Sequence, residues 1–226
     1  MHGIQVRLCI IDQSYRIYYV VVVYIIQIMK RKKLMWLIGG MASGKSTVRR
    51  ALCKVLAESD PVLIEQEGIE YTDFGNIGCV GKCLKEDGCD GLDSSFGRLK
   101  KSGGLATTSV CIDKYELTIL EGSQTSSEWI KELHDICEKR NCDFYVVLLD
   151  CRYWENYLRL KKRIESRGGT EADITDSRIG SVTGKINQFR HVFDKATEYA
   201  KCIRIDTEGL SIEEEVLQVL TATEII

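Results

Sequence analysis

The sequence lacks an excess of charge of either sign. Its 226 residues carry 31 lysines and arginines against 33 aspartates and glutamates, a formal net charge of −2. A protein that coats duplex nucleic acid needs a strong positive field. This class is therefore disfavoured, and any contact with nucleic acid must come from a local patch. Internal repeats are also absent, and the length suits one α/β domain with a sizeable core.

No apolar run reaches the roughly 20 residues that span a bilayer. The most apolar stretch, residues 17–29, is shorter, is preceded by Asp12 and Arg16, and lacks the small-residue cleavage site of a signal peptide. We expect no stable membrane partner. We interpret residues 1–28 as leader sequence ahead of a domain that spans residues 29–226; an additional β-strand is the second interpretation and membrane attachment the third.

Paired clusters of cysteine are lacking, although the chain has ten cysteines. Most are single residues inside apolar patterns, such as Cys53 and Cys202, which is typical of reduced thiols. We therefore expect a cytoplasmic protein, in the host cell if it is viral. The densest run, Cys79, Cys83 and Cys89, fits no familiar zinc spacing, and we expect buried or loop thiols there.

The most specific motif is a glycine-rich segment between an apolar strand, Leu34 to Ile38, and a helical pattern from Val48 to Leu56. The segment reads Gly39-x4-Gly44-Lys45-Ser46 and is a P-loop. Small residues let consecutive backbone N–H groups surround phosphate oxygens, and the following helix presents its positive end to the same anion. The residues expected to bind a nucleoside triphosphate are Gly39, Gly40, Met41, Ala42, Ser43, Gly44, Lys45, Ser46 and Thr47.

Three residues at the end of this motif have distinct expected roles. Lys45 reaches the β- and γ-phosphates, and Ser46 supplies a hydroxyl group to Mg²⁺. Thr47 either bonds a phosphate oxygen or bonds back within the first helical turn. The expected cofactors are therefore ATP and Mg²⁺.

Strand and helix patterns alternate along the rest of the chain, which indicates right-handed crossovers and a parallel sheet. We expect a three-layer α/β fold of the P-loop NTPase type, kinase-like, with helices on both faces of the sheet and a basic helical lid at about residues 152–190. Residues 82–104 are predicted to form a loop that turns helical near Ser94 or Ser95. The expected strands are residues 34–38, a short buried strand at 62–64, and residues 115–122, 144–150 and 202–206. Residues 69–83 are expected to form one or two short strands or a hairpin that carries Asp73.

Carboxylates at strand ends and in one loop are the candidate catalytic acids, because ligands of parallel sheets bind at the carboxyl ends of the strands. Glu121 ends a buried strand and is expected to hold Mg²⁺ or orient the acceptor; Asp150 ends another. Asp90, with Asp93 nearby, lies in a glycine-framed loop and is the leading candidate base, with Asp73 behind it. Capping and Asx-turn roles remain the alternatives for these residues.

Arginines recur every four residues along one predicted helix, at Arg159, Arg163 and Arg167. They share one helical face, so they point towards whatever the helix covers. We expect Arg159 and Arg163 to act on the phosphates as part of a lid, the alternative being a solvated face. Arg178 and Lys185 are weaker candidates of the same kind.

Several segments together resemble bacteriophage P-loop kinases of the 5-hydroxymethyluracil-DNA kinase type. They are the P-loop, Cys79-Val-Gly-Lys82, Gly88-Cys-Asp-Gly-Leu-Asp93, Leu120-Glu-Gly122 and the basic helix, so the resemblance spans most of residues 34–220. It implies transfer of the ATP γ-phosphate to the hydroxymethyl group of a modified pyrimidine in phage DNA. Such a base must be flipped out of the duplex, and the aromatic residues available to stack on it are Tyr71, Phe74 and Trp154, for which core packing is the alternative.

Two other functions stay open. The chain shows no basic surface interleaved with aromatic residues, which leaves a free nucleoside, nucleotide or other small metabolite as the acceptor. A nucleotide-dependent switch or ATPase module is the third hypothesis, although the guanine-reading Asn-Lys-x-Asp sequence is absent. The oligomeric state is left open.

Overall fold

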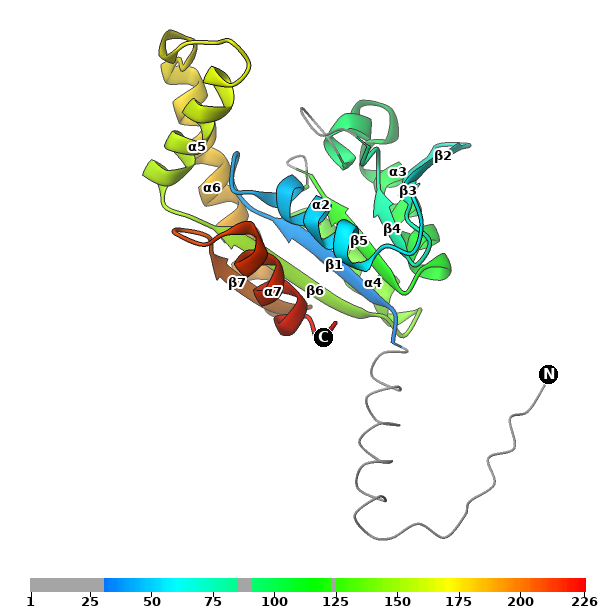
Figure 1. Ribbon diagram of the computed structural model, residues 1–226. Helices are drawn as coiled ribbons and strands as arrows, with labels where there is room; N and C mark the ends of the chain where they lie inside the picture. The colour runs from blue at the N-terminus through cyan, green and yellow to red at the C-terminus, as the bar shows by residue number, and fades with distance from the viewer. Residues whose placement is uncertain (1–30, 85–90, 123–124) are drawn as a thin grey trace, which may run out of the picture. The chain divides into compact units, whose positions relative to one another are not determined.

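The computed structural model describes residues 31–84, 91–122 and 125–226, apart from the side chains of residues 94–98 and 177–178. Residues Lys32–Ile226 form one compact unit (Figure 1). The interpretation of residues 1–28, the candidate base Asp90 and Cys89 lie outside the described residues.

One sheet of seven strands forms the centre of the described chain, in the order β2-β3-β4-β5-β1-β6-β7. Five of these strands run parallel, from β4 at one side to β7 at the other, and β3 runs antiparallel to both of its neighbours. The strands are β1 (Lys33–Ile38), β2 (Val62–Gln66), β3 (Ile69–Asp73), β4 (Ile77–Val80), β5 (Leu117–Glu121), β6 (Asp143–Asp150) and β7 (Lys201–Asp206).

The expectation that strands and helices alternate throughout is wrong for residues 62–80. Here β2, β3 and β4 follow one another without a helix, and the expected buried strand at 62–64 is an exposed edge strand. Glu67 and Gly68 both have positive φ angles, 45° and 81°. A two-residue turn of this kind matches the twist of a hairpin, and it reverses the chain without the crossover that a parallel strand needs.

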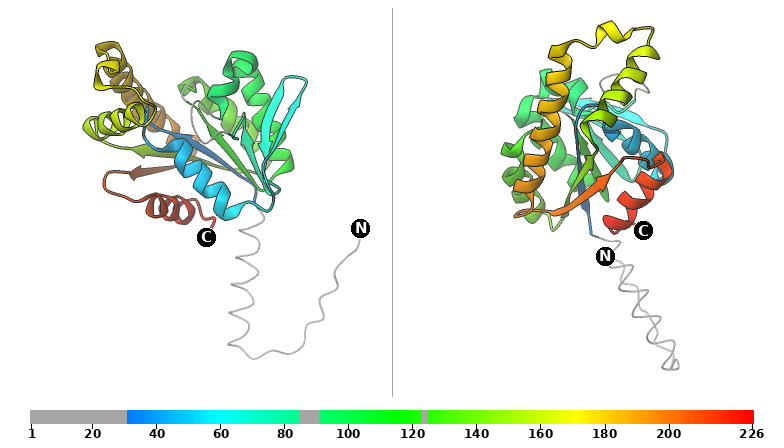
Figure 2. Two further views of the ribbon diagram at one scale, coloured as in Figure 1. Left: turned by 45° about the horizontal axis from the view of Figure 1, so that its top comes forward. Right: turned by 90° about the vertical axis from the view of Figure 1, so that its left-hand side faces the viewer.

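Helices cover both faces of the sheet, as predicted. Helices α2 and α7 pack on one face, and α3, α4 and α6 pack on the other (Figures 1 and 2). The helices are α2 (Lys45–Leu56), α3 (Leu92–Lys114), α4 (Ile130–Glu138), α5 (Tyr153–Glu165), α6 (Asp176–Ala196) and α7 (Ile212–Ala222), with short 3₁₀ turns η1 (Ser127–Trp129) and η2 (Glu171–Asp173). No helix in the described part of the chain is both long and apolar enough to cross a bilayer.

Helix α3 begins two or three residues before the helical stretch that is predicted near Ser94 or Ser95. It starts at Leu92 and continues to Lys114, with a kink at Lys100, where φ is 53° and ψ is −168°. Gly104 has a packing reason: a Cβ there would lie 2.6 Å from the ring of Trp129. Here glycine allows the close approach of α3 to η1 rather than a turn.

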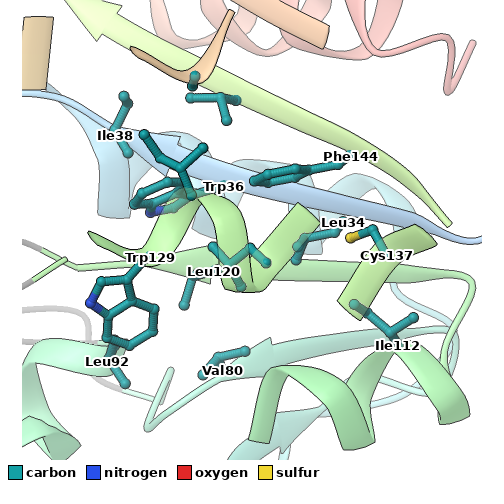
Figure 3. Packing of buried hydrophobic residues seen from close by; sticks show 14 of the residues in the cluster. Leu34, Trp36, Ile38, Val80, Leu92, Ile112, Leu120, Trp129, Cys137 and Phe144 are labelled. Carbon is teal, nitrogen blue, oxygen red and sulfur yellow. The ribbon is translucent and has the colours of Figure 1, made fainter. Parts of the chain in front are cut away.

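Strand β1 anchors the core because side chains on both of its faces are buried. Leu34, Trp36 and Ile38 pack under α3, α4 and α6, while Met35 and Leu37 pack under α2 and α7. Figure 3 shows Trp36 beside Phe144 of β6, with ring centroids 6.5 Å apart. Each such side chain contributes about 1.5–3 kcal/mol of burial free energy. The end of β1, from which the P-loop starts, is therefore held rigidly.

Candidate active site

The P-loop connects β1 to α2 at the carboxyl edge of the sheet. Its glycines are sterically required: a Cβ on Gly39 would lie 2.5 Å from the carbonyl oxygen of Leu149, and one on Gly40 would lie 2.6 Å from the side chain of Ile186. Gly44 caps α2 with a φ angle of 96° and brings no capping side chain. The first N–H groups of α2 are thus left for an anion, at the positive end of the helix.

Lys45 is buried and folds back onto the loop. Its Nζ donates hydrogen bonds to the carbonyl oxygens of Gly39 and Gly40, both at 2.9 Å. Burial lowers its pKa, which the charges of Glu121 and Asp93 partly oppose. The carbonyl oxygens of Gly39 and Gly40 thus satisfy the ammonium group, and phosphate oxygens would replace them when a nucleotide binds.

Glu121 lies beside Ser46 because β5 pairs with β1, with Glu121 opposite Leu37. The Ser46 hydroxyl donates to Glu121 Oε1 at 2.6 Å, and Arg49 Nε donates to Glu121 Oε2 at 3.1 Å. The side chains of Arg49 and Glu121 are 1% and 4% exposed. A hydroxyl and a carboxylate oxygen at this separation are donors that suit Mg²⁺, which binds proteins through few ligands and completes its shell with phosphates and water.

The described side chains alone do not form a complete metal site. No three His, Cys, Asp or Glu side chains within the described ranges form a metal-binding group, and Cys79 and Cys83 of the cysteine run are buried. Ser46 and Glu121 would therefore hold Mg²⁺ only together with the nucleotide phosphates.

Asp93 comes close to Glu121 at the start of α3. A Cβ on Gly122 would lie 3.1 Å from Asp93 Oδ1, and one on Gly91 would lie 2.9 Å from the backbone oxygen of Glu121. Gly91 has a φ angle of 63° with ψ at −144°, a conformation that is nearly restricted to glycine. Asp93, three residues after Asp90, thus brings a second carboxylate close to Glu121.

Two other acids do not join the site. Asp73 ends β3, and β3 runs antiparallel, so Asp73 lies near the start of β4 rather than beside Glu121. Its carboxylate binds Lys114 at 2.8 Å. Burial alone would raise the pKa of Asp73, but hydrogen bonds, including those from Lys114 and the Gly75 backbone N–H, lower it. Asp150 does end β6 at the carboxyl edge, but its oxygens are bound by Arg190, at 3.1 Å, and Arg204, so it fastens α6 and β7 to β6.

Helices α5 and α6, which span the region predicted as a lid, pack against the P-loop through a small apolar cluster. Leu160 of α5 and Val182 and Ile186 of α6 contact Met41 and Ala42 of the loop. In Figures 1 and 2, α5 and the first part of α6 extend past the carboxyl edge of the sheet.

Arg159 binds the loop after β7. Its guanidinium donates to the Thr207 backbone oxygen at 2.7 Å, to the Thr207 hydroxyl at 3.2 Å and to Glu155 at 2.9 Å. Arg163 and Lys185 are close enough to Lys45 for their charges to lower its pKa, after the larger effect of burial. Arg167 lies beyond the end of α5, and the side chain of Arg178 is not among those described.

The candidate base-stacking residues separate into two groups. Tyr71 and Phe74 are buried, 6% and 7% exposed, so they pack in the core. Trp154 is 63% exposed and stacks on Tyr157 of the same helix, with centroids 5.3 Å apart. Of the three, Trp154 alone is accessible to a ligand.

Sequence reasoning missed Arg49. It stands between Val48 and Arg50 with no motif to mark it, yet its side chain is buried and pairs with Glu121. Its position four residues after Lys45 places it one helical turn further along α2, which is the single signal that the sequence offers.

The fold and this site define a three-layer α/β protein of the P-loop type. No protein-family model matches the chain, and neither does any curated protein. Among solved structures it is similar to shikimate kinase from Acinetobacter baumannii in complex with shikimate, with a TM-score of 0.44 and 13% identity over 86% of this chain and 94% of that one. It is also similar to the tunicamycin resistance protein of Deinococcus radiodurans, with a TM-score of 0.44 and 11% identity over 84% of this chain and 95% of that one.

Proposed function

We propose that the protein is a P-loop kinase that transfers the γ-phosphoryl group of ATP to a hydroxyl acceptor. The observation that carries the proposal is the hydrogen bond of 2.6 Å from Ser46 to Glu121. Ser46 is the residue that follows the P-loop lysine, Lys45. Phosphoryl transfer needs a donor held by backbone N–H groups, oxygen ligands for a metal ion, and cations around the transferred group. These residue types meet at one edge of the sheet.

The proposed residues fall into two groups, one that binds the phosphates of the donor and one that acts on the acceptor. On the donor side, Lys45 leaves the carbonyl oxygens of Gly39 and Gly40 and binds the β- and γ-phosphates, while Arg163 and Lys185 offset the phosphate charge. Ser46 and Glu121 would hold Mg²⁺ together with the phosphates, and the ion would supply further charge neutralisation. Arg49 keeps the Glu121 carboxylate in place.

On the acceptor side, a carboxylate accepts the proton of the attacking hydroxyl group as the new phosphoester bond forms. Asp90 is the base that the sequence favours. Asp93 is the alternative that the geometry favours, because its carboxylate lies against Gly122, next to Glu121. The two assignments predict different losses from Asp90→Asn and Asp93→Asn.

The acceptor we propose first is the hydroxymethyl group of 5-hydroxymethyluracil in DNA, which rests on the sequence resemblance and on the exposed Trp154. A free nucleoside, nucleotide or small metabolite is the second acceptor class. A nucleotide-dependent switch is the remaining alternative, in which ATP is bound or hydrolysed without an acceptor.

The test is label transfer from γ-labelled ATP with Mg²⁺ to ordinary DNA, to DNA that contains 5-hydroxymethyluracil, and to free nucleosides and nucleotides. Label in modified DNA alone supports the first acceptor, and label in free compounds supports the second. ATP hydrolysis with no labelled acceptor in a panel extended to small alcohols contradicts the kinase proposal. Asp90→Asn and Asp93→Asn are compared in the same assay, and the true base loses transfer while nucleotide binding is retained.

A further inference from the structure

Glu215 is a buried acid beside the P-loop that the proposed reaction does not use. It is the fourth residue of α7, and it is 1% exposed, whereas Glu213 and Glu214 in the same turn are exposed. Its Oε2 atom has no hydrogen-bond partner among the described residues. A buried carboxyl oxygen without a partner is costly, so the site calls for a physical explanation.

The orphan oxygen faces the last glycine of the P-loop. A Cβ on Gly44 would lie 3.4 Å from Glu215 Oε2 and 4.0 Å from the guanidinium of Arg159. Gly44 caps α2, and the N–H groups that follow it are those that bind phosphate in a P-loop. The Glu215 carboxyl group therefore lies next to the loop that is expected to hold the phosphates.

The charged side chain that acts on Glu215 is Arg159 of α5. Arg159 attracts the carboxylate, but it is already bonded to Glu155 and Thr207. Lys45, the residue after Gly44, donates its hydrogen bonds to the carbonyl oxygens of Gly39 and Gly40.

These surroundings leave burial as the dominant influence on Glu215. Burial raises its pKa to about 7, and the attraction of Arg159 opposes the rise only in part. The carboxyl group is therefore easier to protonate than that of an ordinary glutamate. A small additional field is enough to change its charge.

We propose that Glu215 takes up a proton when a nucleotide binds, so that the P-loop holds its phosphates against a neutral carboxyl group. The proton comes from solvent and bonds to a carboxylate oxygen of Glu215, and no other bond changes. The physical reason is repulsion: the phosphates bring several negative charges next to a carboxylate that water does not screen. The inference rests on the proposed function to the extent that the P-loop must bind a nucleotide.

Proton uptake makes affinity depend on pH. Above neutrality, binding must first protonate Glu215, so affinity falls as the pH rises. For a shift of one to two pKa units on binding, affinity falls roughly tenfold between about pH 7 and pH 9. Glu215→Gln keeps the shape of the side chain without the charge, and its affinity stays level over this range.

The experiment is calorimetric titration with ADP and Mg²⁺ at pH 8, in buffers that differ in ionisation enthalpy. The slope of the observed enthalpy against that enthalpy counts the protons taken up. We expect uptake of a large fraction of one proton by the wild type and by Glu213→Gln, which removes an exposed charge from the same helical turn, and none by Glu215→Gln.

The outcomes separate the two proposals. Nucleotide binding with equal uptake in all three proteins, or with none in the wild type, overturns the role of Glu215 and leaves the proposed function standing. Absence of nucleotide binding in all three overturns the proposed function and this inference with it. Should Glu215→Gln fail to fold, the Glu215 carboxyl titration, followed by ¹³C NMR in the wild type with and without ADP, replaces it; a midpoint that nucleotide does not move overturns the proposal.

Discussion

Replacing Arg49 with methionine tests whether its buried ion pair with Glu121 organises the site. The two side chains are 1% and 4% exposed and 3.1 Å apart, so water offers the carboxylate little compensation when the guanidinium is removed. Breaking a buried pair of this kind costs about 3–5 kcal/mol. For a domain of this size that corresponds to a fall in melting temperature of roughly 10 °C.

The matched control is the double variant Arg49→Met with Glu121→Gln, which removes the charge on both sides. Because two neutral side chains leave no uncompensated charge, we expect most of the lost stability to return, while phosphoryl transfer stays low since Glu121 no longer holds the metal ion. Urea unfolding and label transfer measure the two effects. A cost below about 1 kcal/mol for Arg49→Met, or full transfer by the double variant, would refute the reasoning.

Three further predictions concern single residues. Because the pKa of Glu215 is raised to about 7, the folded state binds more protons than the unfolded state above about pH 4.5, and stability falls as the pH rises to 7. The free energy of unfolding of Glu215→Gln, measured in urea, should therefore exceed that of the wild type by up to about 3 kcal/mol at pH 8 and by almost nothing at pH 4. Asp150→Asn should lower the free energy of unfolding by about 1.5–3 kcal/mol through its bond to Arg190, with ATP binding unchanged by calorimetry. Gly91→Ala should cost about 1–3 kcal/mol in the same unfolding assay and reduce label transfer, because its φ angle is positive and the new Cβ meets Glu121.

Much of the fold could be predicted because its signals are local. The apolar run of β6 and the sequence from Leu34 to Leu56 specify their strands and helix through residues that are adjacent in the chain, and the structure confirms them. The hairpin of β2 and β3 is harder to predict, because Glu67-Gly68 is a weak turn signal and the apolar run at 62–64 indicates a buried strand although β2 lies at the exposed edge of the sheet.

The site was harder to predict because its contacts are distant in sequence. Glu121 was chosen for its place at a strand end, but its partner Arg49 lies 72 residues earlier and looks like any basic residue on a helix. Glu215 stands in a run of three glutamates, and only the packing of α7 against α2 separates it from its exposed neighbours. The packing of elements that are distant in sequence, rather than residue type, decides which charged side chains are buried.

The central claim is that residues 39–47 bind a nucleoside triphosphate with Ser46 and Glu121 as the magnesium side of the site. Equilibrium binding of ATP, measured by calorimetry with and without Mg²⁺ in the wild type, Ser46→Ala and Lys45→Ala, tests it most directly. The account predicts binding that Mg²⁺ strengthens in the wild type, loss of that strengthening in Ser46→Ala, and weak binding in Lys45→Ala under both conditions. Equal binding by all three proteins, or no binding by the wild type, would contradict it.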